Sequence, residues 1–234
     1  MTFTNGPAPG ERGRAARVEG PALSKRRGAA RVEGFTLVEV LIVIAIIGLL
    51  AGLLLPSLLG AKQQARMAAT QSTLQALRGA LEQYQSRFGD YPPSSLAVFR
   101  MGLPNDTNLG IESATACLSS TIGGRPFIEG FREELFGNVD KDAASNNPMK
   151  WFFGDNQLRE VLDDWGNPVI YFHFRDYTKP GPVSKYLIRG KPQACFPQKS
   201  PAIATYHNPY KFQLWSAGPD GINQNGNDDD IVGW

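Results

Sequence analysis

The C-terminal end of the chain concentrates oxygen ligands suited to a cation. Between Asp220 and Asp230 the sequence has four aspartates and three asparagines. Calcium takes roughly six to eight hard oxygen ligands, which carboxylates, Asn amides and backbone carbonyls supply. Like charges in a compact loop repel one another unless a cation is present. This composition favours calcium over a solvated turn, with Asn223 and Asn225 as candidate ligands on composition alone.

Both ends of this polar loop carry apolar residues. Phe212, Leu214 and Trp215 precede it, and Ile231, Val232 and Trp234 follow it. A polar C-terminus is usually frayed, but ends of this kind indicate anchoring in a core. No helices are expected on either side, so the loop does not fit an EF-hand.

A further acidic residue stands out because of its surroundings. Glu39 is the only charged residue in the apolar run 35–59. A carboxylate in hydrocarbon is costly unless it reaches the interface or finds a partner. Taken alone, Glu39 is best interpreted as a headgroup-level residue at the start of a membrane helix.

The residues around Glu39 change this interpretation. The stretch GFTLVE at 34–39 resembles the processing site of type IV prepilins and type II secretion pseudopilins. The resemblance implies that a prepilin peptidase cuts between Gly34 and Phe35 and that Phe35 is then N-methylated. Glu39 would neutralise the Phe35 amine of a neighbouring subunit and so fix the register of a filament. Pro56 belongs to the same match, as the helix-bending proline.

Three shorter stretches resemble the major pseudopilins of type II secretion. They are the helix end 84–92, the loop Asp-Trp-Gly-Asn-Pro at 164–168, which lacks the family's first proline, and the C-terminal loop 216–234. The last match implies a calcium loop with Asp220 and Asp230 as the main side-chain ligands and Asp228 next. The backbone oxygens of Ser216 and Ala217 would complete the site.

The apolar run that contains Glu39 predicts a membrane helix. Residues 35–59 are long and apolar enough to cross a bilayer. Residues 1–34 carry seven basic and three acidic groups, which predicts a cytoplasmic leader, cleaved in the mature chain, and a C-terminal domain in the periplasm or exterior. The remainder has 17 basic and 19 acidic groups, which argues against nucleic acid as a partner.

The same helix is predicted to continue beyond the membrane as an amphipathic segment, 60–89. A stripe at spacings of three and four indicates one buried face, and it comprises Met67, Thr70, Leu74, Leu77, Leu81, Tyr84 and Phe88. We therefore expect one helix over 35–88, bent at Pro56.

The exported globular domain is predicted at 90–234. It contains an insertion at 98–158, with short helical possibilities near 129–137 and 155–163, and β-rich stretches at 168–176, 183–189 and 209–216 that predict an antiparallel sheet over about 168–216. The expected fold class is α+β and type IV pilin-like, with the long N-terminal helix packed on that sheet. Cys117 and Cys195 allow either a disulfide or two buried thiols.

Signals for catalysis are weak, so we expect no enzyme. His173 and His207 are the only histidines, and His173 is predicted to be packed in a strand. The resemblance implies a structural subunit of a type II secretion pseudopilus, in a filament that drives protein export. The implied partners are further copies, prepilin peptidase, minor pseudopilins, the inner-membrane assembly platform and the membrane itself. The alternatives are a type IV pilin for adhesion, motility or DNA uptake, and a single-pass membrane-anchored binding protein.

Overall fold

The computed structural model describes residues 34–99, 104–122 and 124–234. The predicted leader therefore lies outside the described residues, apart from Gly34, as does the stretch 100–103 of the predicted insertion. The chain divides into two compact units, 1–49 and 50–234.

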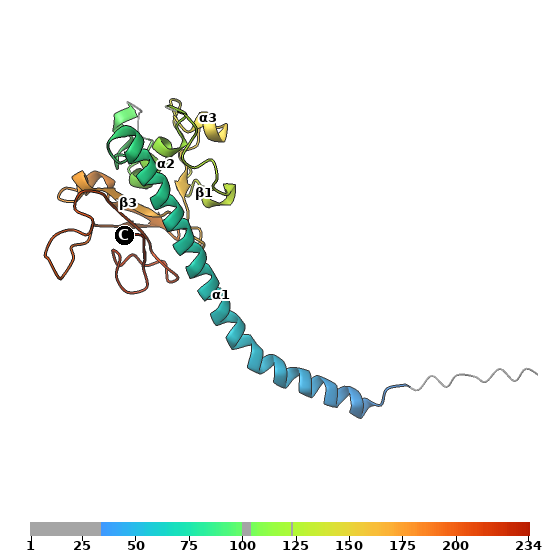
Figure 1. The fold of residues 1–234 in the computed structure, drawn as a ribbon. Helices are drawn as coiled ribbons and strands as arrows, with labels where there is room; N and C mark the ends of the chain where they lie inside the picture. Colours follow the sequence, from blue (N-terminus) through green and yellow to red (C-terminus); the bar gives the residue numbers. More distant parts are fainter. Residues whose placement is uncertain (1–33, 100–103, 123) are drawn as a thin grey trace, which may run out of the picture. The chain divides into compact units, whose positions relative to one another are not determined.

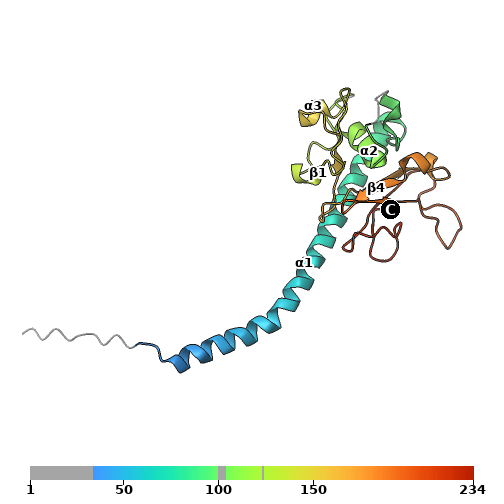
Figure 2. The ribbon, with the colours of Figure 1, turned by 180° about the vertical axis from the view of Figure 1, so that it is seen from behind.

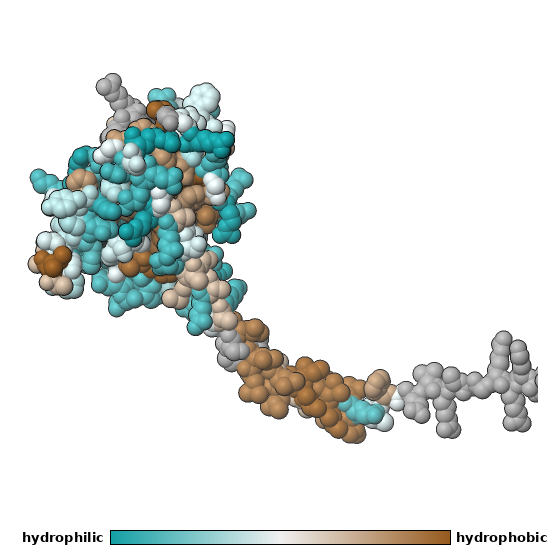
Figure 3. All heavy atoms as spheres, in the orientation of Figure 1, coloured by the Kyte–Doolittle hydropathy of each residue, from teal (hydrophilic) through white to brown (hydrophobic). Residues whose placement is uncertain are grey.

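The first unit holds the start of helix α1 (Leu37–Phe88). Of the described helices, only α1 contains a stretch, Leu37–Leu54, that is long and apolar enough to cross a membrane, and none of this stretch is buried. Figure 3 shows a largely hydrophobic surface along the N-terminal part of this helix. The helix begins two residues later than predicted and continues through Pro56; the bend at Pro56 stays a prediction.

In the second unit, α1 buries the predicted face. Thr70, Leu74, Leu77 and Leu81 are fully buried, while the two ends of the stripe, Met67 and Phe88, are 37% and 42% exposed. The helix ends at Gly89, whose φ of 82° is the left-handed conformation that glycine adopts at helix C-termini. The predicted face is confirmed in its central part.

A three-stranded antiparallel sheet covers that face of α1. The order of its strands is β3 (Ile170–His173), β6 (Phe212–Ser216) and β7 (Ile231–Val232). The side-chain Nε2 of Gln71 on α1 donates to the carbonyl of Val232 over 3.3 Å. The predicted α+β architecture is confirmed, and β7 extends the sheet beyond the predicted limit of 216.

The predicted strand at 183–189 does not join this sheet. It forms β4 (Lys185–Ile188), which pairs with β5 (Lys191–Ala194) in a separate hairpin. Arg189 and Gly190 between them have φ of 49° and 70°, as a two-residue hairpin turn requires. The prediction of one sheet over 168–216 is wrong for this strand, because its local partner lies within two residues.

The segment before the sheet folds into the same core. Helix α2 (Leu109–Ser119) is buried on all sides and contacts β3 and β2. Because no face of α2 is exposed, its sequence lacks the 3.6-residue alternation of apolar and polar residues that predicts a surface helix. The sequence therefore did not predict α2. Of the helices suggested near 129–137 and 155–163, the first is present only as the 3-10 turn η2 (Glu133–Leu135). The second is absent, and β2 (Glu160–Val161) pairs there with β1 (Phe136–Gly137).

The remaining helices are short. They are α3 (Lys150–Phe153) and the 3-10 turns η1 (Leu96–Phe99), η2 (Glu133–Leu135), η3 (Phe174–Asp176) and η4 (Gly181–Val183). The segment that carries β1 and α3 lies on one side of the upper part of α1 and the C-terminal sheet and loops on the other (Figures 1 and 2). Cys117 and Cys195 are buried and form no disulfide.

Candidate functional site

The predicted processing site lies directly before α1. Gly34 and Phe35 are in non-helical chain and exposed, with Phe35 86% exposed. The next residue, Thr36, caps the helix. Its amide and hydroxyl donate to Oε2 of Glu39 over 2.8 and 2.7 Å, and Glu39 N donates to the Thr36 hydroxyl over 3.2 Å.

This reciprocal pair is a capping box, in which an N-cap Thr and a Glu three residues later satisfy free donors of the first helical turn. The spacing Thr-x-x-Glu at 36–39 is the sequence signal of this cap. Both hydrogen bonds that Thr36 donates end on Oε2 of Glu39. The cap thus leaves Oε1 of an exposed carboxylate for a second partner.

In the C-terminal loop, Asp230 is the most enclosed of the three predicted aspartate ligands. Its Oδ2 accepts from the amides of Gln224 and Gly226 over 3.0 and 2.6 Å. Its Oδ1 is buried without a hydrogen-bond partner, and so is Oε1 of Gln224. Burial raises the pKa of Asp230 to about 6. The sequence predicted Asp230 but not Gln224, which is separated from it by five residues.

The other predicted acids lie less deeply. Asp220 is exposed and accepts from the Ile222 amide over 2.7 Å and from Gln224 Nε2 over 3.2 Å. Asp228 is exposed. The loop's aspartates do not form a group of three with oxygens all within 4.8 Å of one another; among the described residues only Glu112, Asp140 and Asp142 do.

The predicted amide ligands hold the loop together. Oδ1 of Asn223 accepts from Trp215 Nε1 and the Asn225 amide. Oδ1 of Asn225 accepts from the Phe196 amide and from Asn223 Nδ2. Since an amide oxygen has two lone pairs, these hydrogen bonds occupy both oxygens fully.

A buried carboxylate joins the loop at 164–168 to the start of the C-terminal loop. Oδ1 of Asp163 accepts from the amides of Trp165 and Asn167, each over 2.9 Å. Its Oδ2 accepts from the hydroxyl of Ser216 over 2.7 Å. Ser216 and the next predicted ligand, Ala217, are both buried. Asp163 directly precedes the motif at 164–168, and no sequence pattern predicted its role.

His173, the predicted packed histidine, contacts Asp90 just after the end of α1. Nε2 of His173 lies 3.2 Å from Oδ1 of Asp90, and its Nδ1 accepts from the Arg175 amide over 3.2 Å. Burial lowers the pKa of His173, against the hydrogen bond to Asp90, which raises it. The prediction that His173 is a packed strand residue is confirmed.

A cavity of about 450 Å³ beside His173 is also lined by Cys117. Burial raises the pKa of the Cys117 thiol to about 12, so the nucleophilic thiolate is disfavoured. Both ring nitrogens of His173 are already engaged. This cavity therefore does not supply the thiol and free base of a nucleophilic site.

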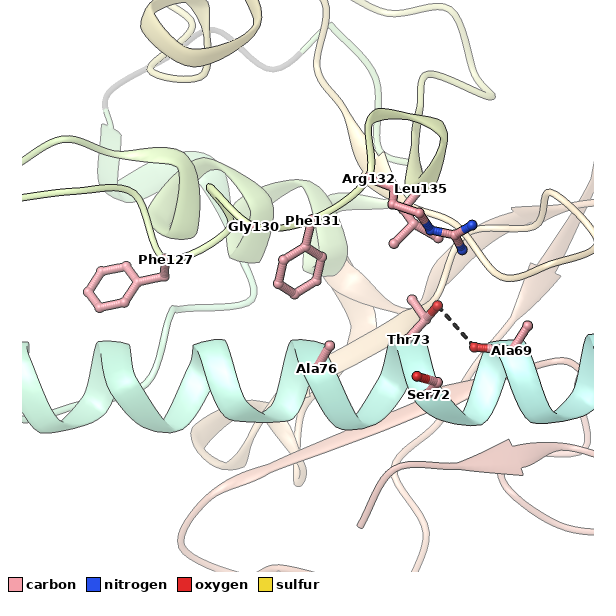
Figure 4. Close-up of a pocket in the computed structure, with 9 residues that line it drawn as sticks. All are labelled: Ala69, Ser72, Thr73, Ala76, Phe127, Gly130, Phe131, Arg132 and Leu135. Atoms are coloured by element: carbon pink, nitrogen blue, oxygen red, sulfur yellow. Dashed lines mark hydrogen bonds between the residues drawn. The ribbon is translucent and has the colours of Figure 1, made fainter.

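A second hollow, of about 380 Å³, lies between α1 and the segment 127–135 (Figure 4). Small residues of the helix form its floor, and the hydroxyl of Thr73 donates to the carbonyl of Ala69 over 3.2 Å. Phe127 and Phe131 line the opposite side. This hollow is lined mainly by small and apolar side chains, which suit packing against another surface better than catalysis.

Comparison with known proteins places these features in a family. Residues 30–55 match the family model of the prokaryotic N-terminal methylation motif. The chain is 26% identical over 200 residues to the type II secretion system core protein G of Aeromonas hydrophila, covering 86% of this chain and 90% of that protein. The corresponding protein of Escherichia coli is 27% identical over 200 residues, or 86% and 89% of the two chains.

A pilus protein is also similar over part of the chain. The type IV wide pilus major component PilA4 of Thermus thermophilus is 37% identical over 93 residues, which cover 38% of this chain and 71% of that protein. No solved structure matches the chain.

Proposed function

Because the chain belongs to the family of prepilin-type proteins that includes type II secretion core protein G and the type IV major pilins, we propose that it is a pseudopilin. It is cleaved between Gly34 and Phe35, N-methylated at Phe35 and assembled into the helical filament of a type II secretion pseudopilus. The observation that carries this is the methylation motif at 30–55, which runs into the exposed apolar stretch of α1.

The chain is anchored in the inner membrane by a single pass of α1. We infer its orientation from the basic groups of 1–34, which keep that segment in the cytoplasm and send residues 90–234 outward. The exposed, non-helical junction at Gly34 and Phe35 leaves that peptide bond free of helical hydrogen bonds. This supports cleavage there by a prepilin peptidase.

Filament assembly follows from the new N-terminus. Cleavage creates an ammonium group on Phe35, four residues before Glu39. The free Oε1 of Glu39 accepts from the Phe35 amine of a neighbouring subunit, while Oε2 keeps its bonds to Thr36. An ion pair removed from water must be well paired to be tolerated, and this requirement fixes the axial register between subunits.

The extent of similarity favours a pseudopilus over a surface pilus. Similarity to core protein G extends over 86% of the chain, against 38% for the Thermus pilus protein. As a filament subunit the protein has a mechanical role in export, and it works with minor pseudopilins and an inner-membrane assembly platform. Deletion of the gene is expected to abolish protein export while surface pili persist; the reverse result would favour the pilin alternative.

We further propose that calcium binds the C-terminal loop. Asp230 Oδ1 and Gln224 Oε1 are buried acceptors without donors, which a cation would satisfy. Asp220 and Asp228 would supply further charge, and the backbone oxygens of Ser216 and Ala217 the remaining ligands. Asn223 and Asn225, the weaker candidates, support the loop through their hydrogen bonds.

Processing is tested by co-expression with a prepilin peptidase. The precursor should shorten by the mass of residues 1–34, and Gly34→Leu should accumulate at full length because a large side chain replaces the glycine at the cleavage point. Gly130→Leu serves as a matched control, since the space around Gly130 is open. Cleavage of Gly34→Leu at the wild-type rate would contradict the assignment.

A further inference from the structure

Four carboxylates from three separated segments meet beneath α2. Glu112 lies in the first turn of α2, Asp140 and Asp142 follow β1, and Glu160 lies in β2. The carboxylate oxygens of Glu112, Asp140 and Asp142 all lie within 4.8 Å of one another. None of these residues belongs to the C-terminal loop, so the cluster is distinct from the calcium site proposed there.

Glu112 enters this cluster without any protein donor. The residue is fully buried, and neither of its carboxylate oxygens has a hydrogen-bond partner. Oδ1 of Asp140 and Oδ1 of Asp142 are likewise buried and unpartnered. A buried charge without a partner is highly unfavourable. Burial, together with the charges of Asp142 and Asp140, raises the pKa of Glu112 to about 11.

Basic side chains do not neutralise the cluster within the described part of the chain. The ion pairs there leave out Glu112, Asp140, Asp142 and Glu160. Asp106, the acidic residue closest to Glu112 in the sequence, forms an ion pair with Lys185 over 2.7 Å. The four carboxylates thus lack a compensating positive charge.

Neutral groups hold the carboxylates in place and orient them. Asn105 Nδ2 donates to Oδ2 of Asp140 and Oδ2 of Asp142, over 3.0 and 3.2 Å. These bonds leave the Oδ1 atoms of both aspartates unpartnered. Asn138 fixes the backbone of Asp142 from both sides, with its Oδ1 accepting from the amide and its Nδ2 donating to the carbonyl.

Glu160 supports the same arrangement from β2. Its Oε1 accepts from Asn108 Nδ2 over 2.9 Å, and its Oε2 accepts from the Val139 amide over 3.2 Å. The second bond fixes the residue immediately before Asp140. Glu160 therefore adds negative charge to the cluster and positions one of its members.

We propose that Glu112, Asp140 and Asp142 bind a calcium ion that joins α2 to the loop 138–142. Oxygen ligands lie about 2.3–2.6 Å from calcium, so two ligands on opposite sides of one ion are about 5 Å apart. The oxygen separations, all within 4.8 Å, do not exceed this span. Three carboxylates also match the preference of calcium for hard, charged oxygens.

The ion would explain how the insertion tolerates its buried acids. Glu112, Asp140 and Asp142 carry three negative charges when ionised, and a divalent ion offsets most of this repulsion while satisfying the unpartnered oxygens. Without an ion, the cluster must instead share protons, for example between Glu112 and Asp140. The two states respond oppositely to removal of the Glu112 charge, which makes them separable.

Calcium titration of the full chain in detergent tests the proposal, with isothermal calorimetry after treatment with a chelator. The Asp220→Ala/Asp230→Ala variant removes the proposed C-terminal site and should still bind one calcium ion per chain. Adding Glu112→Gln should abolish that binding. Adding Asp106→Asn, which removes an exposed carboxylate just before α2, should leave it unchanged.

Native mass spectrometry of the otherwise unchanged chain gives a second measurement. Glu112→Gln should carry one calcium ion fewer than the wild-type chain. An unchanged calcium count would overturn the proposal, as would a folded Asp220→Ala/Asp230→Ala chain without bound calcium. A calcium-independent rise in melting temperature for Glu112→Gln would instead indicate shared protons. Equal affinity for magnesium would refute the assignment to calcium.

Discussion

At the scale of single residues, Glu39 carries two interactions on different oxygens. Its Oε2 is bonded to Thr36 within one helical turn, whereas the proposed contact to a neighbouring Phe35 uses Oε1. The capping box requires a Glu or Gln at this position, but only Glu supplies a charge. Substitution can therefore separate helix capping from filament assembly.

Glu39→Gln is expected to be processed normally and to fail in assembly, because the amide keeps the cap but cannot neutralise the Phe35 amine. Thr36→Val removes the capping hydroxyl and keeps the charge, so it should assemble, with the first turn of the helix weakened by about 1 kcal/mol. Filament yield in the sheared fraction is the measurement. Wild-type yield from Glu39→Gln would show that the charge is not needed.

His173 predicts a pH dependence of stability. Its pKa is lowered by burial, against the raising effect of Asp90, while Arg175 lowers it and Asp176 raises it. As the pH falls, the unfolded chain thus binds a proton at this histidine near the ordinary histidine pKa of roughly 6.5, whereas the folded chain binds it only at lower pH. The contribution of His173 to the free energy of unfolding is therefore fully present above that pH and decreases as the pH drops below it.

His173→Gln should accordingly flatten the decline in melting temperature between about pH 7.5 and pH 5, although it lowers the melting temperature at neutral pH. The difference in slope between the two proteins isolates the histidine from other groups that titrate in this range. Equal slopes for both proteins would mean that His173 does not take part.

At the scale of elements, α1 is held by one row of buried leucines. Leu77→Ala should destabilise the folded domain by about 2–5 kcal/mol, because the side chain is fully buried. Gln75→Ala, on the exposed face of the same helix, should change stability by no more than about 0.5 kcal/mol. Urea unfolding followed by the fluorescence of buried Trp215 measures both. Similar effects of the two substitutions would refute the assigned face.

The sequence predicted this helix because Leu74, Leu77 and Leu81 repeat at helical spacing on one face only. It did not predict α2, whose eleven residues are all buried and so show no periodic contrast. The carboxylate cluster was hidden for another reason. Glu112 and Glu160 are 48 positions apart in sequence, and only the pairing of β1 with β2 and the packing of α2 on β2 bring them together.

The C-terminal loop is the second element with a testable property. Removal of calcium by a chelator should lower the melting temperature, since an ion that binds only the folded state stabilises it. Asp220→Ala/Asp230→Ala should shrink this response, and the remaining shift should vanish when Glu112→Gln is added. An unchanged melting curve with and without chelator would contradict both calcium sites.

At the scale of the whole molecule, each part of the sequence serves a different stage. The motif at 30–55 is a processing signal, the apolar start of α1 is a membrane anchor, and residues 50–234 form a folded unit. The two calcium sites proposed for this unit lie outside the apolar anchor. Processing and assembly are thus expected to depend on residues 34–39, and thermal stability on the carboxylates of the folded unit.

Mass spectrometry of the mature N-terminus in sheared filaments tests whether the chain is processed and assembled as a pseudopilin. The N-terminal peptide is expected to begin at Phe35 and to carry one methyl group on its α-amine. A mature chain that retains residues 1–34, or that begins at any residue other than Phe35, would contradict it.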